Sequence, residues 1–265
     1  MGNYDYRVPK GNYQDVLNID MRVGSIVRNT NGDEARVYDI DYDKKHLYLE
    51  FLSHRNYCAL EPCVATSVVV GSFKDWYSKT VFKTGHTGFP PEKDGPIYYA
   101  WHSMIGRIGH KPEGRYRDAN LSPMFSCYQE FYYWYKKEER VNGYKYQVDK
   151  DLFATSETPY YSEDTCCLLP KAINVSLAER SRPKQIFKAF GKYYISTNKG
   201  GELGLPDESY HFETPDDCIQ FYNDFKRMKI LHLVDEYKDV LMPHVINRLK
   251  DYTFNHEYEL VTFRK

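Results

Sequence analysis

The chain has 265 residues, enough for two or three small domains, and its net charge of −1 excludes a global basic field, so any DNA contact has to use local patches. Its 26 tyrosines and 16% aromatic residues exclude a disordered chain. The six cysteines form no C-x-x-C pair, which predicts free thiols in a reducing cytoplasm rather than a zinc finger. We find neither the apolar run of a signal peptide nor that of a membrane span, and expect no secretion and no membrane partner.

The pattern along the chain predicts a multidomain α+β protein. We expect a small β-rich domain over residues 19–80 and a linker over residues 81–96. A central module of helices around a hairpin follows over residues 97–179. A sheet-plus-helix domain, predicted to contain a three-stranded sheet, completes the chain over residues 180–265.

The first domain is predicted to be a small β-barrel or meander. Two period-two runs and two shorter β runs are separated by turn signals at Asn31-Gly32 and at 43–45. The expected strands are 25–28, 35–40, 46–51 and 67–71. Such domains bind proteins or nucleic acid in some cases and only pack in others, so the role of this one stays open.

Glycine and proline are dense over residues 84–96, which indicates a linker or an extended strap. Helices are expected at 97–108 and 125–139, because apolar residues recur there with helical spacing. Arg107, near the end of the first helix, is a candidate phosphate ligand. The alternative for it is an ordinary solvated side chain.

A hairpin with two acids follows these helices. Val148 to Asp151 reads as a short β run, a second run is expected at 166–169, and a short helix with Asn174 comes next. Because Asp149 and Asp151 stand two positions apart, on a strand they would face the same side and share one divalent cation. The alternative is an exposed Asp-Lys-Asp turn with no chemistry.

The segment 180–200 combines cations with aromatic residues and contains no acid, which favours phosphate binding. Its cations are Arg180, Arg182, Lys184, Lys188, Lys192 and Lys199. The alternative is a basic surface on an ordinary hairpin. Thr214, Pro215 and two following acids predict the start of a helix that reaches about residue 239. A short helix near Pro243 and an edge strand within 253–263 are expected last.

Five motifs occur in a fixed order: Tyr98-x-x-Trp101-x-x-Met104-Ile105-x-Arg107, Tyr116-Arg117-Asp118, Phe125-x-x-Tyr128-x-x-Phe131-x-x-Trp134-Tyr135, Val148-Asp149-Lys150-Asp151 and Tyr161-Ser162-x-x-Thr165-Cys166. In this order they resemble a family of phage-encoded proteins related to HNH-type homing endonucleases, over roughly residues 20 to 250. The chain departs from that pattern, since Ile108, Ala119 and Ser122 replace family cysteines. Lys150 stands where ordinary HNH nucleases have a histidine base.

The resemblance implies a catalytic set of Asp149, Lys150, Asp151 and Asn174. In that set Asp149 and Asp151 hold Mg²⁺, Lys150 contacts the phosphate, and Asn174 orients the hairpin or a ligand.

The short strands before Phe212-x-Thr214-Pro215 resemble ethylene-response-factor-like DNA-binding domains, in which a three-stranded sheet lies in the major groove. That resemblance makes Lys188, Lys192, Tyr194 and Ser196 the groove-facing candidates. The full DNA-binding set expected from the sequence is Arg107, Arg180, Arg182, Lys184, Lys188, Lys192, Tyr194 and Ser196.

The leading hypothesis is a homing-type endonuclease that binds double-stranded DNA in the cytoplasm of an infected bacterium and cleaves it with Mg²⁺. The second is a catalytically inactive descendant that binds DNA or a host or phage protein, which the replaced cysteines and the missing histidine favour. A virion-associated component, with contacts made by the β-rich domain, is the third.

Overall fold

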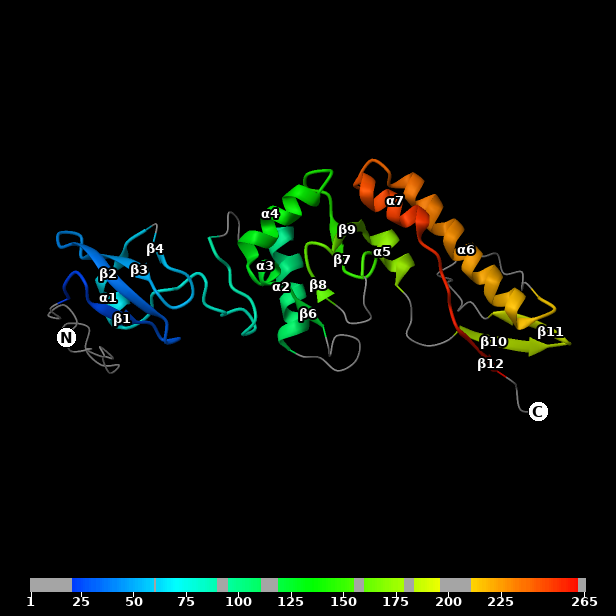
Figure 1. The fold of residues 1–265 in the computed structure, drawn as a ribbon, viewed down its shortest axis with the longest axis horizontal. Helices are drawn as coiled ribbons and strands as arrows, with labels where there is room; N and C mark the ends of the chain where they lie inside the picture. The colour runs from blue at the N-terminus through cyan, green and yellow to red at the C-terminus, as the bar shows by residue number, and fades with distance from the viewer. Residues whose placement is uncertain are drawn as a thin grey trace.

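The computed structural model describes residues 21–59, 61–89, 95–110, 119–154, 160–178, 184–195 and 211–261. These residues form seven helices and twelve strands, which confirms the mixed α+β class. Figure 1 shows an N-terminal sheet, a central group of helices around a hairpin, and C-terminal helices beside a second sheet. All six cysteines are free thiols, as predicted.

The N-terminal sheet is an antiparallel meander of β1 (Ile26–Arg28), β2 (Glu34–Asp41) and β3 (His46–Phe51), extended by β4 (Tyr57–Cys58) and β5 (Cys63–Val64), which both pair with β3. Alternate side chains of the first three strands are buried in one core, as their period-two pattern predicted. The core residues are Val27, Ala35, Val37, Leu47, Leu49 and Phe51.

The prediction of a fourth strand at 67–71 is wrong, because residues Ala65–Val69 form the short helix α1. Val68 and Val69 are buried, and Val68 packs into the core of the sheet. A short run of β-branched residues fits a buried helical turn as well as a strand, and periodicity cannot separate the two. The described strands form an open meander rather than a closed barrel.

The described part of the predicted linker, residues 81–89, is a strap that lies on the central helices. The amide of His86 donates to the Ser126 carbonyl, and the amide of Tyr128 donates to the His86 carbonyl, both at 2.9 Å. The Phe82 ring packs against His102, and a Cβ on Gly109 would lie only 2.5 Å from the Phe82 Cβ. Glycine at position 109 therefore permits the close approach.

The central helices are α2 (Pro96–Gly109), α3 (Pro123–Ser126) and α4 (Tyr128–Glu138). Trp101 is fully buried and its indole Nε1 donates to the Phe125 carbonyl at 2.9 Å. The helix expected at 125–139 is interrupted at Cys127, which is extended because it bridges to His86 of the strap.

The predicted hairpin is present. β7 (Tyr146–Asp149) pairs antiparallel with β9 (Cys167–Pro170), and α5 (Lys171–Leu177) follows directly. β9 is buried at every position, so the hairpin is held between the central helices and the C-terminal ones. A second pair, β6 (Asn120–Leu121) with β8 (Tyr160–Tyr161), is parallel.

The C-terminal sheet has the order β11 (Lys192–Ile195), β10 (Lys184–Ala189), β12 (Tyr258–Val261), and β12 is the expected edge strand. It packs on α6 (Pro215–Glu236), the helix that begins where Thr214 and Pro215 predicted it. The Thr214 hydroxyl accepts a hydrogen bond from the Asp217 amide at 3.1 Å.

One hydrophobic core joins the hairpin to the C-terminal helices. Leu152, Leu169 and Ile173 pack there with Leu241 of the α6–α7 connection and Val245 of α7 (Pro243–Asp251). The boundary predicted between residues 179 and 180 therefore separates segments that share a core.

Candidate functional site

A pocket of about 830 Å³ lies between α2, the turn after β7, and α5. Its lining mixes cations, carboxylates, an amide and several tyrosine hydroxyls. The polar lining residues are Tyr99, Ser103, Arg107, Tyr146, Gln147, Asp149, Lys150, Asp151, Tyr161, Asn174 and Tyr252. All five candidate site residues of the central module line this pocket: Arg107 on α2, Asp149 at the end of β7, Lys150 and Asp151 in the turn after it, and Asn174 on α5.

Asp149 is the last residue of β7 and is 8% exposed. Its Oδ1 accepts hydrogen bonds from the amides of Asp151 at 3.0 Å and Leu152 at 2.8 Å, which closes the turn after the strand. Burial raises the pKa of this carboxyl, while the two amide donors act in the opposite direction. Both of these amides donate to Oδ1, and within the described part of the chain no hydrogen bond to Oδ2 is found.

The sequence argument placed Asp149 and Asp151 on one strand, and this is wrong. β7 ends at Asp149, because the Asp149 carboxylate accepts hydrogen bonds from the amides of Asp151 and Leu152 and the chain turns there. Asp151 therefore lies in the turn, with its side chain 56% exposed. Both acids still line the same pocket, but the turn, rather than strand alternation, brings them there.

Lys150, which stands between the two acids in the sequence, is buried. This burial distinguishes the turn from an ordinary solvated Asp-Lys-Asp segment. The Lys150 side chain is 7% exposed and its Nζ forms an ion pair with the Asp151 carboxylate. The same Nζ lies 5.9 Å from the centroid of the Tyr161 ring. The Tyr161 hydroxyl in turn accepts from Nη1 of Arg107 at 3.5 Å, so Tyr161 lies between the two cations of the pocket.

Asn174 joins α5 to the hairpin. Its Nδ2 donates to Oε1 of Gln147 at 2.8 Å, and Gln147 lies on β7 two residues before Asp149. The hydrogen bond connects α5 to β7, the strand that ends at Asp149. The part of Asn174 in catalysis remains a prediction.

Sequence reasoning missed the contribution of the C-terminal helices. Tyr252, directly after α7, lines the pocket, and Nε of Arg248 on α7 donates to the Leu152 carbonyl at 2.9 Å. Tyr252 lines the pocket and Arg248 contacts the lining residue Leu152 only through tertiary packing, and no local motif marks either residue.

The candidate residues of the C-terminal sheet do not share one face. The register of β10 with β11 places Lys188 opposite Tyr193, and the Lys188 Nζ lies 4.9 Å from the centroid of that ring. Lys184 reaches the Tyr222 ring of α6, also at 4.9 Å. Since side chains alternate along a strand, Lys184 and Lys188 lie on the α6 side and Tyr194 on the opposite side. The prediction that Lys188 and Tyr194 face a groove together is wrong.

The face away from α6 is more aromatic than cationic within the described residues. The rings of Tyr194 and Phe187 stack with centroids 5.6 Å apart, and Lys192 is paired with Glu213. Arg180, Arg182 and Ser196 lie outside the described residues.

Comparison with protein-family models, with curated proteins and with solved structures gave no significant match. The likeness to phage endonucleases therefore rests on the ordered motifs alone. Within the part of the chain that the structure describes, no helix is long and apolar enough to cross a membrane.

Proposed function

We propose that the chain is a DNA-binding protein that cleaves phosphodiester bonds with a divalent cation in the pocket beside β7. The observation that supports this most is the convergence of Arg107, Asp149, Lys150, Asp151 and Asn174 on that one pocket. Metal-dependent cleavage needs acidic side chains that bind the metal ion and basic side chains that bind the phosphate, and the pocket contains two of each. In this proposal a central nuclease module is flanked by an N-terminal β-rich domain and a C-terminal DNA-binding domain.

The two cations of the pocket are the proposed phosphate ligands. Arg107 supplies a guanidinium, which matches phosphate geometry, and Lys150 supplies a point charge held in a largely buried position. The Lys150–Asp151 ion pair has to open when a phosphate binds, so that Lys150 turns to the phosphate and the Asp151 carboxylate is released.

The acids of the pocket fit Mg²⁺, which proteins commonly hold through one or two carboxylates together with substrate phosphates. Oδ2 of Asp149 and the exposed Asp151 carboxylate supply such oxygens. When bound, the cation would neutralise charge on the scissile phosphate and lower the pKa of an attacking water. No histidine is among the described residues that line the pocket, so the proposal assigns Lys150 to the phosphate and not to a base.

Two observations favour a second function, binding without cleavage. The Asp151 carboxylate is already neutralised by Lys150, and the outer face of the C-terminal sheet is aromatic. A binding-only protein gives no nicks with any cation. Its affinity falls steeply with salt if the partner is DNA and weakly if the partner is a protein.

The proposal is tested by incubating the purified chain with supercoiled plasmid in Mg²⁺, in Mn²⁺ and in EDTA, and by following nicked circles on a gel. We expect nicking in Mg²⁺ or Mn²⁺ and none in EDTA. A mobility shift without nicks supports the binding-only function, and intact, unshifted DNA contradicts both.

A further inference from the structure

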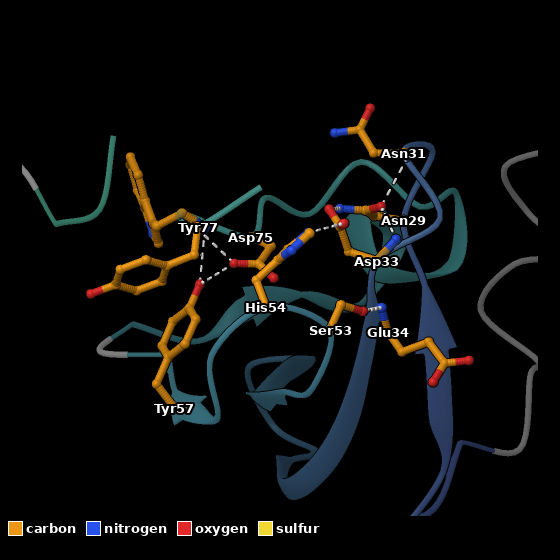
Figure 2. Close-up of polar contacts among 10 residues, drawn as sticks. Asn29, Asn31, Asp33, Glu34, Ser53, His54, Tyr57, Asp75 and Tyr77 are labelled. Atoms are coloured by element: carbon orange, nitrogen blue, oxygen red, sulfur yellow. Dashed lines mark hydrogen bonds and ion pairs between the residues drawn. The ribbon is translucent and has the colours of Figure 1, made fainter. Parts of the chain in front are cut away.

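A second group of polar side chains lies in the N-terminal sheet, apart from the pocket. Asp33 lies in the turn between β1 and β2, His54 follows β3, and Asp75 follows α1. One potential ligand atom from each side chain lies within 4.8 Å of the other two. Figure 2 shows the His54 ring between the two carboxylates.

A hydrogen bond from Asn29 holds the Asp33 carboxylate in place. The Asp33 side chain is 7% exposed, and its Oδ2 accepts a hydrogen bond from Nδ2 of Asn29 at 2.7 Å. Its Oδ1 lies 2.8 Å from Nε2 of His54. Asn29 therefore fixes the carboxylate with Oδ1 directed at the imidazole.

Asp75 provides an independent sign of a missing ligand. It is fully buried, and its Oδ1 accepts from the Tyr57 hydroxyl at 3.0 Å and from the Tyr77 amide at 2.9 Å. Its Oδ2 is buried without a hydrogen-bond partner. Figure 2 shows this second oxygen on the His54 side of the carboxylate. A buried, unsatisfied carboxylate oxygen is costly, and a bound ion is one established remedy.

We infer that Asp33, His54 and Asp75 bind one divalent transition-metal cation, with Zn²⁺ as the best match. Imidazole nitrogen with carboxylate oxygens is a normal Zn²⁺ donor set, whereas Mg²⁺ and Ca²⁺ prefer oxygen alone. The cation would replace the Asp33–His54 hydrogen bond and give Asp75 Oδ2 its partner. Two carboxylates also neutralise its charge. His54 is 39% exposed, which leaves an entry path and a position for water.

The three ligands come from three separate loops, so the cation would cross-link them. Asp75 also begins the segment that leads to the strap. The Trp76 carbonyl accepts from the Gly88 amide at 2.9 Å, and the Tyr77 ring centroid lies 5.6 Å from that of His86. Metal binding is therefore expected to stiffen the connection between the N-terminal sheet and the strap.

The test uses the full chain freed of metal with a chelator and titrated with Zn²⁺ by calorimetry and with Co²⁺ by visible absorption. We expect one cation per chain, with Co²⁺ ligand-field bands and no thiolate charge-transfer band. His54→Ala should weaken binding by more than about tenfold, since even the loss of a supporting contact costs that much at metal sites. Because His54 is exposed, this variant should fold. His46→Ala, at the opposite end of β3, is the matched control and should bind like the wild type.

Asp75→Asn provides a second variant, since an amide oxygen still accepts from Tyr57 and Tyr77 while one carboxylate ligand is lost. Equal Zn²⁺ affinity in the wild type and both variants overturns the inference, as does a wild type that binds no cation. A thiolate band overturns it as well, because the cation would then lie at cysteines such as Cys58. Asp149→Asn should retain the Zn²⁺ site, which separates this result from the fate of the proposed nuclease pocket.

Discussion

Nε of Arg248 donates a hydrogen bond to the carbonyl oxygen of Leu152, 2.9 Å away. This contact joins α7 to the turn that carries Asp149, Lys150 and Asp151, the acids and the buried lysine of the pocket. Leu152, which lines the pocket, also packs in one core with residues of α6 and α7, so the C-terminal helices hold the turn from outside the pocket.

We predict that Arg248→Met lowers the nicking rate about tenfold or more while the free energy of unfolding falls by only about 1 kcal/mol, the usual value of one hydrogen bond. The reason is that Met keeps the packing of the stem and loses the donor that holds the Leu152 carbonyl. Initial nicking rates and urea unfolding measure the two effects. Lys250→Met, an exposed change on the same helix, is the control. Wild-type nicking by Arg248→Met would show that the contact does not position the turn.

The charge and the hydrogen bonds of the Asp149 carboxyl should have opposite effects on the stability of the protein. The folded pKa of this carboxyl is raised above the unfolded value, so the carboxyl costs stability when it is ionised, and this cost disappears as the pH falls through the folded pKa. Asp149→Asn keeps the acceptor for both amides, and we expect stability equal to or above that of the wild type at pH ~7, with a smaller difference at pH ~5. Asp149→Ala leaves both amides without their acceptor and should lose about 1–3 kcal/mol. Urea unfolding of the three proteins at both pH values tests this, and an Asn variant as unstable as the Ala variant would contradict it.

His86 of the strap should make the protein sensitive to acid. Burial, aided by the nearby charge of Lys79, lowers the pKa of His86 to about 4, and among the described residues its buried Nδ1 has no hydrogen-bond partner. Because the unfolded chain has a histidine pKa of about 6.5, the unfolded state takes up the proton first. Stability is therefore complete above pH ~6.5 and declines as the pH falls toward about 4.

His86→Gln should flatten this decline, and urea midpoints measured across that pH range would show it. His232→Gln, at an exposed position of α6, is the control and should keep the wild-type slope. An unchanged slope in His86→Gln would mean that other groups cause the acid sensitivity.

DNA binding should depend on Arg107 and not on Lys188. If Arg107 contacts one phosphate, Arg107→Gln should reduce the slope of log K against log salt by about 0.9. Lys188 lies on the α6 side of its sheet, beside Tyr193, so Lys188→Gln should leave the slope unchanged. Fluorescence anisotropy with a labelled duplex over a salt series measures both. A reduced slope in Lys188→Gln would show that this lysine reaches DNA after all.

Local signals in the sequence predicted the elements well where a cap and a periodic pattern agreed. Thr214 and Pro215 located the start of α6, where the Thr214 hydroxyl caps the helix. The pattern failed where two structures satisfy it equally, as at the valines of α1, or where a side chain competes for the backbone, as Asp149 does at the end of β7.

Features made by tertiary contact had no local signal. Arg248 reaches the turn only because α7 packs on the hairpin. Asp33, His54 and Asp75 are spread over separate loops, and each has ordinary neighbours in the sequence.

The central claim is that the carboxylate of Asp149 serves the cleavage of DNA. The most direct measurement compares nicking of supercoiled plasmid in Mg²⁺ by the wild type, by Asp149→Asn and by Asp164→Asn, with the folded state of each verified by circular dichroism. Asp164 is an exposed acid on the neighbouring turn and does not line the pocket. The proposed function predicts nicking by the wild type and by Asp164→Asn and none by folded Asp149→Asn. Equal nicking by all three proteins would contradict it.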